Sequence, residues 1–236
     1  MRRQLTGSLG LSLILVMGAY GAPNKPAAPT NEDKEIRIRI RNYAQVDPND
    51  LAKAERVTDD ILHEAGVQAV WIECSAGEIP AKDPACAIPP GPTDLVLNLL
   101  PRSMSDRFQL GAERFGVALE NAEDGFGFDA WIFCDLVRDA AAKKQLTRSV
   151  LLGTVMVHEL GHLLLSTNSH SGFGVMQANW SGKELSAVEH RAMYFSSSES
   201  KRIQQAVMAR RQSVVARTQS ANSRPLSTGS EIEGSR

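Results

Sequence analysis

The sequence lacks several features that would place the protein in a familiar class. It has three cysteines in 236 residues, and none are paired at the short spacing of a cysteine-ligated zinc site. Its formal net charge is −1, and no segment combines a dense basic run with aromatic residues. These absences argue against a nucleic-acid partner. No internal repeat is present, and the middle of the chain is long enough for one sizeable core.

The two ends of the chain differ from its middle. Arg2 and Arg3 precede a short apolar stretch over 9–17 and then small residues, a pattern that predicts a signal peptide over residues 1–21. That stretch is shorter than the about 20 residues that span a bilayer, so no stable membrane insertion is expected after signal removal. A Pro-rich, disordered linker is predicted over 22–33 and a polar, disordered tail over 218–236. The folded domain is therefore expected over 34–217, in the periplasm or beyond.

Cysteine usage agrees with export. Cys74 and Cys86 flank a loop of Gly, Pro and Asp, and a disulfide between them is credible in an oxidising compartment. Closing such a loop would stabilise the fold by roughly 2–3 kcal/mol in the chain-entropy model. Cys134 ends an apolar run and is expected to be a buried free thiol.

Hydrophobic periodicity predicts a sheet with a crossover helix. The strict alternation over 36–41 indicates a strand with isoleucines on a buried face and arginines on a solvated one. The predicted elements after it are a helix opened by Pro48 and ended by Gly66, strands over 67–73, 94–100 and 115–119, and a strand ending at Cys134. This order predicts a mostly parallel sheet, with 115–119 as a short edge strand.

The residues His158-Glu159-Leu160-Gly161-His162 carry the clearest chemical signal. Histidines four apart lie on one face of a helix, so both imidazoles can reach a common zinc ion. Glu159 is about 100° round the helix from His158, where it can take a proton from zinc-bound water without being a ligand. The flanking runs 150–157 and 163–165 are apolar almost all round, which predicts a buried helix. Burying two histidines and a glutamate costs on the order of several kcal/mol of folding free energy unless they form hydrogen bonds or bind a metal ion.

Beyond this helix, 166–169 favour a turn, and His170 is followed by a Gly-rich segment that ends at Met176. With these residues the chain resembles the metzincin clan of zinc metallopeptidases, whose signature is HExxHxxGxxH followed by a turn with a Met beneath the metal. The signature's glycine falls on Leu165 and its third histidine on Asn168. His170 is therefore the nearest substitute for the third ligand, and a longer turn could bring it back to the metal.

The resemblance covers roughly residues 150–180 and implies a divergent bacterial metallopeptidase that holds one Zn²⁺ per chain and cleaves a peptide or protein substrate. It implies His158, His162 and His170 as ligands, Glu159 as the general base and Met176 as an apolar floor. The fold expected is α+β: an α/β-type N-terminal subdomain with a mixed twisted sheet and packed helices, then a small helical C-terminal part. The helices of that last part are predicted over 183–195 and 199–217.

Two alternatives stay open. Glu184 or Glu189, on a later predicted helix, could complete the site as in the gluzincin type of zinc peptidase, although a glutamate in a first helical turn also complements the helix dipole. The protein could instead be an exported zinc-binding scaffold without activity. Astacin-like metzincins carry a tyrosine two residues after the Met, and here that position is Ala178.

Overall fold

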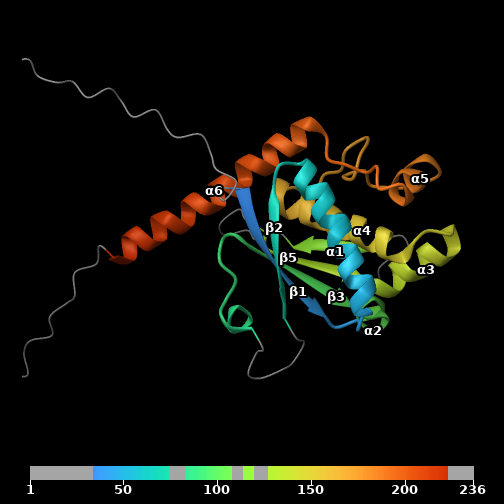
Figure 1. The fold of residues 1–236 in the computed structure, drawn as a ribbon, viewed down its shortest axis with the longest axis horizontal. Helices are drawn as coiled ribbons and strands as arrows, with labels where there is room; N and C mark the ends of the chain where they lie inside the picture. Colours follow the sequence, from blue (N-terminus) through green and yellow to red (C-terminus); the bar gives the residue numbers. More distant parts are fainter. Residues whose placement is uncertain (1–33, 75–82, 108–113, 120–126, 223–236) are drawn as a thin grey trace, which may run out of the picture.

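The computed structural model describes residues 34–74, 83–107, 114–119 and 127–222 (Figure 1). These residues form an α+β fold, as predicted. The strands are β1 (Glu35–Asn42), β2 (Gln68–Glu73), β3 (Asp94–Leu100), β4 (Gly116–Leu119) and β5 (Asp129–Phe133). The helices are α1 (Pro48–Glu64), α2 (Arg102–Arg107), α3 (Cys134–Lys144), α4 (Arg148–Leu165), α5 (Lys183–Glu189) and α6 (Ser197–Asn222). The predicted signal peptide and linker lie outside the described residues.

The strands form one mixed sheet in the order β2-β1-β3-β5-β4. β1 pairs in parallel with both β2 and β3, and β3 pairs in parallel with β5. β4 is antiparallel to β5 and lies at the edge of the sheet. The prediction of a mostly parallel sheet with a short edge strand is therefore confirmed.

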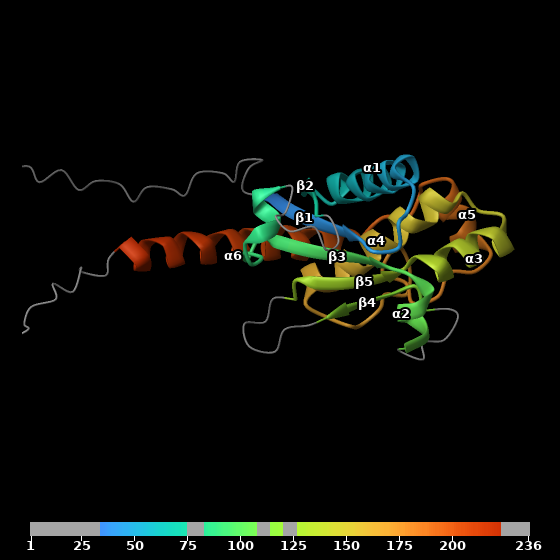
Figure 2. The same ribbon diagram turned by 90° about the horizontal axis from the view of Figure 1, so that it is seen from below.

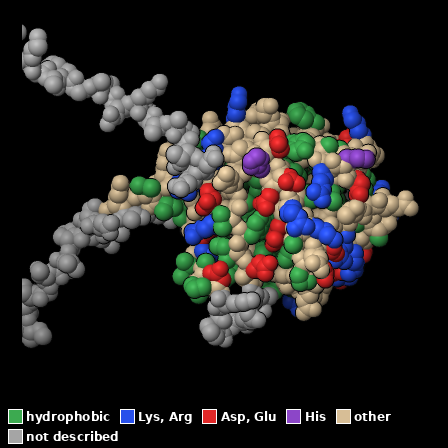
Figure 3. Space-filling model, viewed as in Figure 1, with side chains coloured by type: hydrophobic (Ala, Val, Ile, Leu, Met, Phe, Trp, Pro, Cys, Tyr) green, Lys and Arg blue, Asp and Glu red, His purple; other side chains and the backbone are tan. Residues whose placement is uncertain are grey.

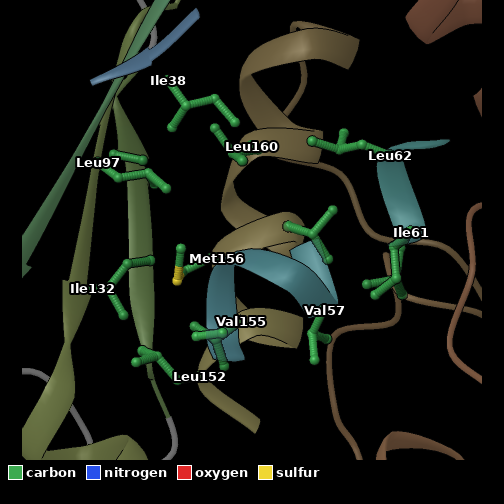
Figure 4. Packing of buried hydrophobic residues seen from close by; sticks show 14 of the residues in the cluster. Ile38, Val57, Ile61, Leu62, Leu97, Ile132, Leu152, Val155, Met156 and Leu160 are labelled. Carbon is green, nitrogen blue, oxygen red and sulfur yellow. The ribbon is translucent and has the colours of Figure 1, made fainter. Parts of the chain in front are cut away.

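The core lies where α4 packs between the sheet and α1. Figure 4 shows Ile38, Leu97 and Ile132 of the sheet directed toward Met156 and other apolar residues of α4. On the far side of α4, Val57 and its neighbours on α1 complete the same cluster. Seventeen of the eighteen residues of α4 are buried, which confirms the sequence-based prediction of a buried helix.

α1 and α4 are in close contact at Gly153. A Cβ atom at this position would lie 2.7 Å from the Cβ of Val57, closer than packed side chains approach. The hydroxyl of Thr58 donates across the same contact to the Gly153 carbonyl oxygen at 3.1 Å. Glycine is therefore needed here for close helix packing.

The second face of β1 differs from the prediction of a solvated row of arginines. Arg39 is buried, with 1% of its surface exposed, and donates to the Ile88 carbonyl oxygen at 2.6 Å and to the carboxylate of Asp94. Arg37 pairs with the same carboxylate and stays partly exposed. The alternation could not show this burial, because the partners of Arg39 come from the loop before β3 and from β3 itself.

The predicted disulfide between Cys74 and Cys86 is confirmed, with a Cα–Cα distance of 5.6 Å. It joins the end of β2 to a short 3₁₀ helix, Pro84–Ala87, in the loop that precedes β3. Cys134 is a free cysteine, as predicted, but it begins α3 rather than ending a strand and is only partly buried. Its thiol group is more deeply buried than the residue as a whole, which raises the thiol pKa to about 12, so the thiol stays protonated at neutral pH.

The C-terminal helices have different limits from those predicted. α5 ends at Glu189, short of residue 195, and α6 continues to Asn222, past the predicted start of the tail. Figures 1 and 2 show the C-terminal part of α6 projecting beyond the rest of the described chain. Its middle is anchored by Arg210, which is buried and donates to the carbonyl oxygens of Gly127 and Leu163, both at 2.9 Å. Among the described helices, none is both long and apolar enough to cross a bilayer.

Acidic side chains of α1 and β2 meet on the face shown in Figure 3, where charges of both signs are interspersed. Burial raises the pKa of Glu55 from 4.5 to about 7, and repulsion from Glu73 and Asp59 adds to the shift. The native state therefore holds this proton at pH values where the unfolded chain has lost it. Stability is consequently lost as pH rises from about 4.5 to about 7.

Glu55→Gln is therefore expected to leave the free energy of unfolding nearly unchanged at pH 4 and to raise it by about 1–2 kcal/mol at pH 8. The expected gain is smaller than the pKa shift alone would give, because solvent screens the charge of this half-buried group. Urea unfolding of both proteins at the two pH values measures this. The exposed Glu64 on the same helix supplies a matched control, since Glu64→Gln should give a smaller gain. An equal gain at both pH values would contradict the electrostatic explanation.

Candidate metal centre

α4 carries three of the predicted site residues, and its end directs the chain back toward them. His158, Glu159 and His162 are all buried in the helix. The helix ends at Ser166, which is left-handed with φ 48° and ψ 51° and donates its N–H to the His162 carbonyl oxygen. After this turn the chain returns toward the helix and places His170 beside the two helical histidines.

The three imidazoles form a compact group. The ligand nitrogens of His158, His162 and His170 lie within 4.8 Å of one another, and no other group of three potential metal ligands is found among the described residues. The Nε2 atoms of His158 and His162 are 3.2 Å apart. Tetrahedral zinc with nitrogen ligands separates two of them by about 3.3 Å, so this pair has the spacing that zinc requires.

Hydrogen bonds on the far side of both helical rings favour metal binding. His158 Nδ1 lies 2.7 Å from the Val175 carbonyl oxygen, and His162 Nδ1 lies 2.7 Å from that of Thr167. A carbonyl oxygen only accepts, so each Nδ1 carries the proton and each Nε2 presents a lone pair. Burial, with smaller contributions from the other two histidines, lowers the pKa of His158 to about 4. This imidazole is therefore neutral at pH 7, as a metal ligand must be.

Glu159 extends toward the edge strand β4. Burial raises the pKa of its carboxyl group to about 8, while the charge of Arg114 and a hydrogen bond from the Ala118 backbone act in the opposite direction. Gly116 leaves room for this side chain, because a Cβ there would lie 2.6 Å from the Cγ of Glu159. Gly116 and Arg114 were not singled out from the sequence, since only the folded sheet brings β4 to the helix.

Met176 packs against α4 at Gly161, the residue before His162. A turn leads to it, in which Ser171 N donates to the Met176 carbonyl oxygen at 2.8 Å. Met176 is buried, and its sulfur would collide with a Cβ atom at Gly161. Trp180, which the sequence did not single out, forms a wall of the site, its ring perpendicular to that of His158 with centroids 5.6 Å apart.

The two alternative ligands lie apart from the histidine group. Both carboxylate oxygens of Glu189 accept from Thr147, at 2.7 Å from its N–H and 2.6 Å from its hydroxyl, which lowers the pKa of Glu189. Glu184 is in the first turn of α5 and accepts from Ser181 N at 3.4 Å. Both glutamates therefore have structural contacts at helix starts.

The end of α4 determines which residue joins the helical histidines. Leu165 is still helical, and the left-handed residue that ends the helix is Ser166. The turn that follows places His170, rather than Asn168, with His158 and His162.

No protein-family model matches the chain, and no curated protein matches it. Among solved structures, an archaemetzincin from Methanopyrus kandleri is similar, with 14% identity, a TM-score of 0.46, and coverage of 74% of this chain and 96% of that one. TM1509 from Thermotoga maritima has 11% identity and a TM-score of 0.32, covering 82% of this chain and 99% of that one. Sequence identities and TM-scores this low do not assign a function, so the function must be inferred from the site itself.

Proposed function

We propose that the protein is a zinc-dependent peptide-bond hydrolase. His158, His162 and His170 hold one Zn²⁺, and Glu159 is the general base. The observation that carries the proposal is the pair of Nε2 atoms 3.2 Å apart, each on a ring whose Nδ1 faces a carbonyl oxygen. Two lone pairs that converge in this way repel each other unless a cation lies between them.

Zinc held by three imidazoles would supply Lewis acidity, which acidifies water and polarises a carbonyl group. Glu159 accepts the proton of the attacking water and delivers it to the leaving amine. Burial raises the pKa of Glu159 to about 8, and the Ala118 N–H and the charge of Arg114 offset only part of that shift. The positive charge of a bound Zn²⁺ would add to these two effects and favour the ionised carboxylate that this role requires. An extended peptide can pair with the outer edge of β4, which among the described strands pairs only with β5. Such pairing would bring a peptide bond next to Glu159.

The compartment and the limits of the catalytic unit are also part of the proposal. We take 34–217 as the catalytic domain, with α6 continuing to Asn222, and propose that the protein acts after export. The disulfide between Cys74 and Cys86 supports this, because structural disulfides persist mainly in oxidising compartments.

The ligand set is tested by metal content. Dialysed wild-type protein should contain about one zinc per chain, and His170→Ala should weaken zinc binding far more than Glu184→Ala. The reason is that only the histidine lies within reach of the other two. Competition with a chromophoric chelator measures both affinities. A larger loss of zinc affinity for the glutamate variant would indicate a gluzincin-type site. Folded wild-type protein that takes up no zinc would refute the proposed metal centre.

Activity is tested with a diverse peptide library. The zinc-loaded protein should cleave some of its members, a chelator should abolish cleavage, and added zinc should restore it. Fully loaded protein that cleaves nothing would favour the alternative of an exported zinc-binding protein without catalytic activity.

A further inference from the structure

His170 is the least supported of the three histidines. His158 and His162 are on α4 and have ring nitrogens at 2.7 Å from backbone oxygens. His170 is exposed and follows the helix end by several residues. Within the part of the chain that the structure describes, its imidazole makes no hydrogen bond that would hold it toward the other two. Its ring contacts those of His158 and His162, with centroids 5.3 and 4.8 Å away, and its position otherwise depends on its neighbours in the chain.

The next residue, Ser171, is fixed at two points. Its N–H donates to the Met176 carbonyl oxygen at 2.8 Å, which closes the turn. Its hydroxyl donates to the carboxylate of Glu199, which has only 6% of its surface exposed. The other carboxylate oxygen of Glu199 accepts from Ser196 N at 2.7 Å. A buried carboxylate that receives donors on both oxygens is held rigidly.

Glu199 belongs to a stable helix start. Ser196 and Glu199 form a capping box, in which Ser196 Oγ accepts from Glu199 N at 3.2 Å while the Glu199 carboxylate bonds back to Ser196 N. α6 is also tied to the end of α4, since Arg202 donates to the Leu165 carbonyl oxygen at 3.2 Å. One helix therefore holds both the end of α4 and the residue after His170.

We propose that Glu199 is a positioning residue for His170 and acts through Ser171. The proposal rests on the metal centre proposed above. His170 follows the helix end and is exposed, so it has more freedom than the two histidines within α4, and each conformation that points away from the metal weakens binding. Glu199 removes part of that freedom by fixing the residue that follows His170.

Two serine variants separate this role from plain stability. Ser171→Ala removes the hydroxyl that reaches Glu199 and leaves the capping box intact. Ser196→Ala removes a bond of the capping box and leaves the Ser171 contact intact. Each should lower the melting temperature of the metal-free protein by about 2–4 °C, as expected for one lost hydrogen bond of this kind.

Only Ser171→Ala should weaken zinc binding, by about tenfold, the lower end of what loss of an outer-sphere partner does. Ser196→Ala should bind zinc as the wild type does, and Ser171→Thr, which keeps the hydroxyl, should restore most of the affinity. Chelator competition gives the affinities, and the absorption spectrum of the cobalt-substituted protein reports the coordination sphere. Wild-type affinity in Ser171→Ala, or an equal loss in Ser196→Ala, would overturn the proposal.

A metal-free readout keeps this proposal distinct from the metal centre itself. NMR relaxation of the His170 imidazole in the apo protein should show faster, wider motion in Ser171→Ala than in wild type or Ser196→Ala. Wild-type protein that binds no zinc would refute the proposed function. Unchanged imidazole motion in Ser171→Ala would refute the role of Glu199, whatever the zinc result.

Discussion

Glu159→Gln is expected to lower kcat/KM by about 10²–10⁴-fold, the usual contribution of a general base, while zinc content stays at the wild-type level. The amide keeps the size of the side chain, and its oxygen can still accept from the Ala118 N–H. It has no group that can take a proton from water. The three histidines are untouched, so metal binding and folding should persist.

The control is Glu184→Gln, the same chemical change on a helix apart from the histidines. It should leave turnover and zinc content unchanged. Measurement of both variants on one peptide substrate, with zinc analysis of the same samples, separates loss of chemistry from loss of metal. Full activity in Glu159→Gln would mean that the base is another group and that the proposed mechanism is wrong.

Gly153→Ala is expected to reduce the free energy of unfolding by about 2–3 kcal/mol, the effect of over-packing a filled core. The new methyl group would collide with Val57 of α1, and it would strain the Thr58 hydrogen bond across the contact. The steric penalty should exceed the gain of about 1 kcal/mol that alanine brings within a helix.

Gly172→Ala provides the comparison, because nothing lies within 4 Å of a Cβ atom at that position. Its unfolding free energy should stay close to that of wild type. Denaturant unfolding with equal m-values would make the two results comparable. If Gly153→Ala were as stable as Gly172→Ala, the two helices would have room to separate, and the close contact would not be required.

Local patterns predicted the elements whose burial follows from their own sequence. Pro48 and Gly66 bound the region of α1, and the alternation of β1 placed Ile36, Ile38 and Ile40 in the core. The burial of the Arg39 side chain could not be predicted in this way. Its partner Asp94 is 55 residues away in the sequence, and only the pairing of β1 with β3 brings them together.

The residues of the candidate site also fall into those that local sequence predicts and those that only the fold brings together. His158, Glu159 and His162 were predicted because their geometry is internal to one helix. His170 was the preferred third ligand, but the choice over Glu184 depended on where the chain turned after α4. Gly116, Arg114 and Trp180 had no motif to mark them. The segment around the start of β4, which carries the first two, and the segment before α5, which carries Trp180, reach the site only through the fold.

The left-handed residue at the end of α4 shows that this reversal of the chain does not depend on glycine. Ser166 makes the turn with φ 48°, a conformation that costs a residue other than glycine on the order of 1 kcal/mol. Seventeen residues of α4 are buried, and their packing outweighs so small a penalty. A search of other sequences for three histidines arranged in this way should therefore allow any residue, rather than glycine alone, at the position where the chain turns back.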